Sequence, residues 1–248
     1  MNFRAFSVSS ILAAALAWTV FPSAAAHRLS SESSSALRCN VTNVALRLPA
    51  NQTQLFQPNT TLSFLALAVG VQNYTCSNTS TWTNIGAVAD LFDISCLANS
   101  LIFDAIPSIT YCAWNSTPDL ITPLDMISVF TGNPDVLGQH YYVPNPAGSG
   151  TSPKWDFTSA AYKGDSNAYV VGAKVGDLPA PDTKEDIDWV QLKSVEGELA
   201  TVVYRTQTKG GQPPTSCTPG SALLSVKYTS QYWFFGSSLK KLHEKEEL

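Results

Sequence analysis

The feature that most constrains the fold of this chain is a succession of strand-like segments with no long amphipathic helix between them. From Cys39 onward, runs rich in β-branched and aromatic residues alternate with clusters of Gly, Pro, Asn and Asp, which is typical of strands joined by turns. The absence of an amphipathic helix longer than about three turns disfavours α/β folds. We therefore expect an all-β domain, a β-sandwich or a flattened β-barrel, with at most one or two short helices.

The expected strands have clear limits along the sequence. They cover residues 62–74, 84–92, 168–175, 189–195, 200–208 and 223–235. A short helix is expected around 94–103, and the Pro, Gly and Ser of 143–154 predict a loop. Glu196-Gly197-Glu198 is expected to form a hairpin turn between two of the strands.

The first 26 residues have the features of a cleaved signal peptide. Arg4 precedes an apolar run at 11–21, and the small residues 23–26 close it. The run is too short for a bilayer, which needs ~20 residues. We expect export, with a low-complexity segment at 27–38, a single domain at 39–236 and a charged tail at 237–248. The final Lys-Glu-Glu-Leu resembles an ER-retrieval signal, so residence in the ER lumen is the alternative to secretion.

Composition and glycosylation signals agree with an extracellular protein. Charged residues make up only 14% of the chain, against ~25% in ordinary domains. The net charge of −4 gives no reason to expect nucleic acid or an anionic membrane as partner. Six Asn-x-Ser/Thr sequons predict N-glycosylation, at Asn40, Asn51, Asn59, Asn73, Asn78 and Asn115. Asn73 is the least favourable acceptor, because it lies in a strand-like run near a cysteine.

Several sequence blocks occur together in a characteristic order. They are 70–76 (GVQNYTC), 86–93 (GAVADLFD), 138–142 (GQHYY), 204–211 (YRTQTKGG) and 232–235 (YWFF). With these blocks the chain resembles an uncharacterised family, a domain of unknown function found in many secreted fungal proteins and some bacterial ones. Its members are often labelled malate dehydrogenase. This chain has no Gly-x-Gly-x-x-Gly turn between a strand and a helix, which nicotinamide binding requires, so we reject that activity and expect no cofactor.

Five cysteines in an oxidising compartment predict disulfides with one thiol left over. The resemblance implies that Cys39, Cys76, Cys96 and Cys217 are the usual cysteines of such proteins, and that Cys112 is additional. It favours Cys39–Cys96 and Cys76–Cys217 as the pairs, with the other connectivities left open.

One histidine lies inside the expected domain, and it is the natural centre of any catalytic hypothesis. His140 would act as a general base, with Asp156, Asp188 and Arg205 as helpers. The competing interpretation is a histidine that hydrogen-bonds a loop to the sheet, and no Gly-x-Ser-x-Gly elbow presents a nucleophile. Copper held by His27 and His140 is less favoured, since the segment after His27 looks disordered.

Acidic and aromatic residues suggest two further kinds of site. Asp182, Glu185, Asp186 and Asp188 could hold calcium or serve glycoside hydrolysis, but a solvated loop is the commoner meaning of such a run, and we expect no metal. Tyr142 and Trp155, beside the loop at 143–154, are candidates for a platform that stacks on sugar rings, with core packing as the competing interpretation.

These observations favour a secreted, glycosylated, disulfide-linked binding module without catalytic activity. Its partner would be cell-wall carbohydrate or a host surface. The alternatives are an extracellular enzyme centred on His140, which would bring the histidine, an acid and Arg205 into one pocket, and a β-barrel with an internal cavity for a small apolar molecule. The sequence does not define an oligomeric state.

Overall fold

The computed structural model describes residues 39–239 of the 248-residue chain. The expected signal peptide at 1–26, the segment 27–38 and residues 240–248 of the charged tail lie outside this range, as do His27 and the retrieval-like ending. In residues 39–239, no helix has both the length and the hydropathy needed to cross a membrane.

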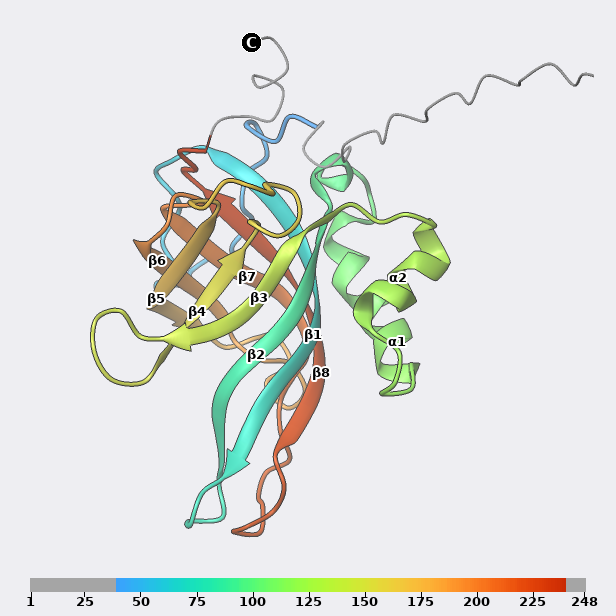
Figure 1. The fold of residues 1–248 in the computed structure, drawn as a ribbon, viewed down its shortest axis with the longest axis vertical. Coiled ribbons are helices and arrows are strands. Elements are labelled where there is room, and N and C mark those ends of the chain that lie inside the picture. Colours follow the sequence, from blue (N-terminus) through green and yellow to red (C-terminus); the bar gives the residue numbers. More distant parts are fainter. Residues whose placement is uncertain (1–38, 240–248) are drawn as a thin grey trace, which may run out of the picture. The chain divides into compact units, whose positions relative to one another are not determined.

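Eight antiparallel strands form a closed barrel in which each strand pairs with the next and β8 pairs with β1 (Figure 1). The strands are β1 (Leu62–Cys76), β2 (Trp82–Asp93), β3 (Val136–Pro144), β4 (Thr151–Asp156), β5 (Tyr169–Leu178), β6 (Trp189–Glu196), β7 (Val202–Gly210) and β8 (Leu224–Phe235). The all-β expectation is confirmed, and of the two architectures considered the chain adopts the barrel.

The apolar run in β1 is explained by burial on both faces of the strand. Successive side chains point to opposite faces, so Phe64, Ala66 and Ala68 pack into the barrel core. Leu65 and Leu67 point outward and are buried under helices and the N-terminal segment. A strand covered on both sides loses the apolar–polar alternation of a half-exposed strand and becomes continuously apolar.

Two short helices, α1 (Ile106–Ser116) and α2 (Pro123–Thr131), lie in the connection from β2 to β3. The helix expected at 94–103 is instead two single 3-10 turns, Ser95–Leu97 and Phe103–Ala105. The α-helices begin later because a proline occupies the first turn of each, where its missing N–H costs nothing.

The loop expected at 143–154 is also shorter than its composition suggested. β3 continues to Pro144 and β4 begins at Thr151, and the two pair in register, so only 145–150 form the connection. Pairing between neighbouring strands outweighs the local preference of Pro, Gly and Ser for turns.

Two disulfides tie the barrel to its surroundings. Cys39–Cys96 joins the N-terminal segment to the β2–β3 connection, and Cys76–Cys217 joins the end of β1 to the β7–β8 connection. These are the pairs that the family resemblance implied. Cys112 on α1 is an exposed free thiol.

Candidate binding site

The barrel interior divides into a packed end and an open end. At the packed end, Phe157 meets Phe64 and Phe234 edge to face, with ring centroids 5.7 and 5.5 Å apart. Tyr162 adds a further edge contact to Phe64 at 5.9 Å. These rings fill the end of the barrel near the start of β1, so an apolar ligand would find no space there.

A layer of aromatic rings separates the packed end from the open one. The His140 ring stacks on Trp155 with centroids 4.7 Å apart, and Tyr232 meets both rings edge-on, at 5.5 and 5.2 Å. Beyond this layer the next inward residues along β3 and β7 are Tyr142 and Arg205, and both line open space. The open space therefore begins at Tyr142 and Arg205, one inward position further along each strand than the buried interior.

The cavity at the open end has a volume of about 710 Å³. It lies where β1 ends and β2 begins, beside the β3–β4 turn and the start of β6. Its lining combines aromatic rings, amides and charged groups from several strands, including Gln72, Tyr74, Trp82, Asn84, Tyr142, Asp188 and Arg205. A concave site with a few converging polar groups is the usual form of a small-molecule pocket.

Arg205 is the central charged group of this cavity. Its Nε and Nη2 atoms donate to the backbone carbonyl of Asp188, at 3.1 and 2.8 Å. Tyr142, Tyr228 and Tyr232 surround the guanidinium closely enough to interact with it electrostatically. Within residues 39–239, none of the ion pairs includes Arg205.

Two carboxylates stand at the mouth of the cavity. The pKa of Asp188 is raised above its usual value, mainly by burial and to a smaller extent by the negative charge of Asp177. Asp177 forms an ion pair with Lys174, and all three side chains line the cavity. The mouth is therefore polar, with the Asp177 charge largely balanced by Lys174.

Gln72 is a buried polar residue that the sequence reasoning did not select. Its side chain is 2% exposed, and Oε1 accepts a hydrogen bond from Asn84 at 3.0 Å. Within residues 39–239, its Nε2 atom has no hydrogen-bond partner. The sequence does contain a signal for this residue. Gln72 follows a series of apolar residues at the inward positions of β1, and a buried polar side chain normally has a hydrogen-bond partner.

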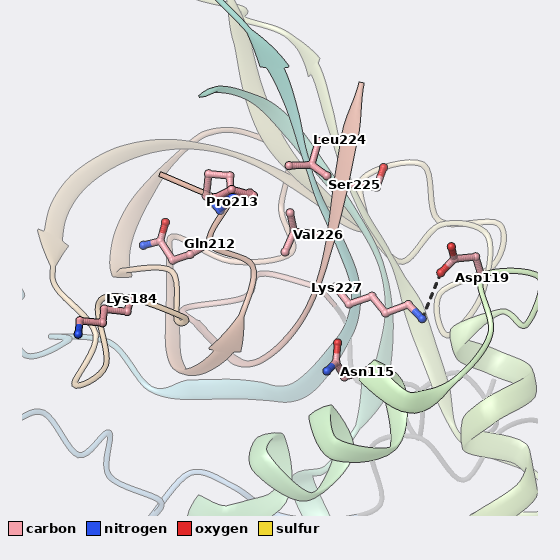
Figure 2. Close-up of a pocket in the computed structure, with 10 residues that line it drawn as sticks. Asn115, Asp119, Lys184, Gln212, Pro213, Leu224, Ser225, Val226 and Lys227 are labelled. Atoms are coloured by element: carbon pink, nitrogen blue, oxygen red, sulfur yellow. Dashed lines mark ion pairs between the residues drawn. The ribbon is translucent and has the colours of Figure 1, made fainter. Parts of the chain in front are cut away.

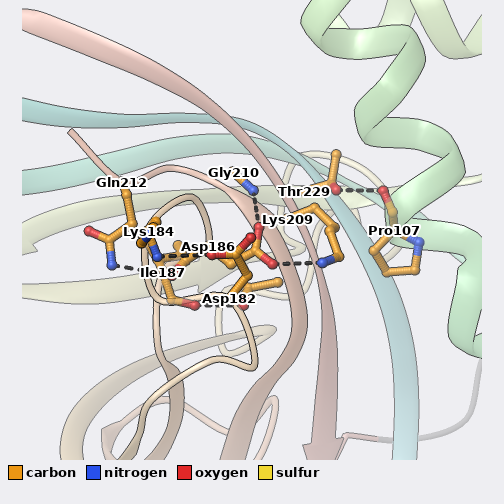
Figure 3. A network of polar contacts seen from close by, with 10 residues as sticks. Pro107, Asp182, Lys184, Asp186, Ile187, Lys209, Gly210, Gln212 and Thr229 are labelled. Atoms are coloured by element: carbon orange, nitrogen blue, oxygen red, sulfur yellow. Dashed lines mark hydrogen bonds and ion pairs between the residues drawn. The ribbon is translucent and has the colours of Figure 1, made fainter. Parts of the chain in front are cut away.

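The acidic segment 182–188, which we call the rim strap, carries a network of polar contacts (Figure 3), and its last two residues, Ile187 and Asp188, line the cavity. Asp186 is only 2% exposed and accepts hydrogen bonds from Lys209 Nζ at 2.6 Å and from the Gly210 amide at 2.8 Å. Gln212 donates to the Asp186 carbonyl at 3.2 Å. Asp186 is thus a structural anchor, so the expectation of a solvated run is wrong for this residue, whereas Asp182 and Glu185 are exposed. Among residues 39–239, no group of three His, Cys, Asp or Glu side chains is suited to a metal ion.

The four residues of the catalytic hypothesis do not form one site. Arg205 and Asp188 line the cavity, whereas His140 does not. His140 is 1% exposed, and its Nδ1 donates to the Lys154 carbonyl at 2.9 Å. Burial lowers the pKa of His140 from 6.5 to about 4, so the ring is neutral at physiological pH.

Asp156 lies on the opposite side of the barrel wall from His140. Successive side chains of a strand alternate, and Trp155 points inward, so Asp156 points outward. There it accepts a hydrogen bond from Tyr141 at 2.6 Å and pairs with Lys154 at 2.9 Å.

The two aromatic candidates for sugar stacking also separate. Trp155 is 1% exposed and packs within the ring layer, so it offers no surface platform. Tyr142 is partly exposed and lines the cavity.

A second hollow of about 560 Å³ lies outside the barrel, next to the rim (Figure 2). Lys227 pairs with Asp119 across it at 3.3 Å, and Asn115 at the end of α1 borders it. Since Asn115 is the acceptor of a sequon, a glycan there would project over this hollow. The hollow is therefore the weaker candidate for a ligand site.

A third depression is almost wholly apolar. It has a volume of about 950 Å³ and lies between α1, α2 and the start of the β2–β3 connection, with Ile109, Met126 and Phe130 in its wall. Cys112 also borders it. The segment carries further exposed apolar side chains, notably Leu101 and Val129. Nothing in the sequence patterns had singled out this surface.

The sequon asparagines differ in exposure. Asn73, in β1, is partly buried and accepts a hydrogen bond from Ser225 at 2.7 Å. The remaining five are exposed: Asn40, Asn51, Asn59, Asn78 and Asn115.

Comparison with known proteins agrees with the resemblance of the sequence blocks. The model of one family, described as "Protein of unknown function (DUF3455)", matches residues 57–236, which include all eight strands. No curated protein and no solved structure matches the chain. The chain is a member of the DUF3455 family, and its family domain is the barrel that carries the cavity.

Proposed function

We propose that this protein is exported, N-glycosylated and non-catalytic, and that it binds a saccharide in the open end of its barrel. The observation that carries the proposal is the cavity of about 710 Å³, which is lined by both aromatic and amide side chains. Barrels of eight strands are wide enough to hold one small ligand.

The chemistry of the lining favours a sugar over an apolar molecule. Tyr74, Trp82 and Tyr142 offer ring faces to the C–H side of a sugar, and Gln72 and Asn84 offer donors and acceptors to its hydroxyl groups. An apolar ligand would desolvate the Nε2 atom of Gln72 and the remaining N–H groups of Arg205 without offering them an acceptor. A cavity rather than a flat platform suits one or two sugar units or a chain end, and this includes glycans of a cell surface.

Export is supported by several independent features. The signal-like N-terminus, the two disulfides and the five exposed sequon asparagines are typical of the secretory pathway, where disulfides form and persist. The Lys-Glu-Glu-Leu ending leaves residence in the ER lumen as the alternative location.

The enzyme hypothesis receives less support from the geometry. A general base must reach the proton it removes, yet His140 is buried in the ring layer and its Nδ1 donates to a carbonyl. Asp156 is on the outer surface, and the cavity brings together only Asp188 and Arg205 of the four residues.

A glycan-array screen of the mature protein, followed by titration calorimetry of the hits, tests the proposal. Tyr142→Ala should weaken binding at least about tenfold, since it removes a ring of the cavity wall, and tenfold corresponds to about 1.4 kcal/mol. Tyr141→Ala is the matched control, because this neighbouring tyrosine points outward and contacts Asp156. Equal affinities of the two variants, or no binding to any glycan, would contradict the proposed function.

A further inference from the structure

Arg205 poses a problem of charge balance inside the barrel. Arg205 is half-buried and lines the cavity, and within residues 39–239 no carboxylate forms an ion pair with it. Two of its N–H groups donate to a neutral acceptor, the carbonyl of Asp188. Charges withdrawn from water are normally paired, because removing an ion from water without a counter-charge is expensive.

The surroundings of Arg205 leave hydrogen-bond donors free for a ligand. A guanidinium has more N–H groups than its two bonds to the Asp188 carbonyl and its contact with Tyr232 use. In the same cavity, the Nε2 atom of Gln72 is a buried donor without a partner. Both groups donate, so the ligand group that fits them is an acceptor with several lone pairs.

The mouth of the cavity supplies only part of the negative charge that would balance Arg205. Asp177 is already paired with Lys174. The carboxyl group of Asp188 interacts electrostatically with Arg205, but burial and the neighbouring Asp177 raise its pKa, and the hydrogen bonds from Arg205 go to the backbone carbonyl of Asp188.

We propose that the ligand of this cavity is an acidic saccharide whose carboxylate binds Arg205, with Gln72 as a second donor. The inference rests on the proposed function and adds the charge of the ligand to it. A carboxylate matches the planar fork of a guanidinium and forms shorter and stronger hydrogen bonds with it than a hydroxyl group does.

Glucuronate and glucose are suitable probes, because they differ in one group, a carboxylate in place of a hydroxymethyl. Titration calorimetry at low and high salt should show glucuronate binding at least about tenfold more tightly than glucose, with a preference that shrinks as salt is added. Arg205→Gln should abolish the preference. Lys193→Gln is the matched control, because it removes one positive charge from the exposed outer face of β6.

Arg205→Lys covers the case in which the glutamine variant does not fold. Lysine keeps the positive charge but lacks the planar guanidinium, so this variant should retain only part of the preference for glucuronate over glucose. Near-UV circular dichroism of each variant checks its folding. Equal binding of both sugars by the wild type would overturn the acidic ligand and leave the proposed function standing. Binding of neither probe, together with a negative glycan array, would overturn both.

Discussion

The rim strap provides a sharp quantitative test of how the cavity is held in shape. The buried carboxylate of Asp186 accepts one hydrogen bond from Lys209 and one from the Gly210 amide. Asp186→Asn keeps the shape of the side chain but replaces one acceptor oxygen by a donor, so one bond and the ionic attraction are lost.

The size of the effect follows from these contacts. Hydrogen bonds to charged groups contribute about 1.5–3 kcal/mol each. The side chain of Lys209 is 36% exposed, so in the variant its ammonium group can be hydrated. The expected decrease in the free energy of unfolding is therefore near the lower limit, at about 2 kcal/mol. If the free energy of unfolding decreases by about 2 kcal/mol per molar urea, the urea concentration at the unfolding midpoint should fall by about 1 M.

Urea unfolding followed by circular dichroism measures this shift, and hydrogen exchange locates it. The amide of Ile187, which donates to the Gly210 carbonyl at 3.1 Å, should lose protection. Asp104→Asn is the control, since Asp104 pairs with Arg47 on the surface, where both side chains are more than half exposed. If the two substitutions shift the midpoint equally, the strap is not the anchor described above.

Two further predictions concern stability. The pKa of His140 falls from 6.5 to about 4 on folding, so between these pH values the unfolded chain binds more protons than the folded chain. The free energy of unfolding should therefore decline by up to about 3 kcal/mol as pH falls from 7 to 4. His140→Gln should flatten this part of the pH profile in urea unfolding, and an unchanged slope would refute the assignment. Replacing both Cys76 and Cys217 by serine removes a disulfide with a sequence separation of 141 residues. Chain entropy then predicts a decrease of about 5 kcal/mol in the free energy of unfolding. A thermal midpoint within about 2 °C of that of the wild type would contradict this prediction.

Local patterns predicted most of the strands, because the period-two alternation and the turn residues act over short distances. They did not predict the β3–β4 pairing or the position of α1. Thr151–Asp156 becomes a strand because β3 and β5 lie on either side of it, in spite of its Pro and Ser. That outcome depends on neighbours distant in sequence, which a local pattern does not contain.

The candidate site was predictable only in parts. Arg205, Asp188 and Tyr142 were selected from the sequence, and all three line the cavity. Trp155 and His140 were selected as well, but both are buried in the ring layer and do not line the cavity. The sequence did not reveal this, because an aromatic ring or an imidazole has the same sequence signal whether it faces a ligand or a core.

The sequence by itself determined the all-β class, the family, and which cysteines and aromatic residues were available. Only the tertiary structure decided that the sheet closes, since closure requires β1 to pair with β8 across almost the whole domain. Closure also places Gln72 and Arg205 in one cavity, Asp156 outside it and His140 beneath it. Which face of a strand a residue occupies is set by register, and register in a closed barrel is fixed by all eight strands together.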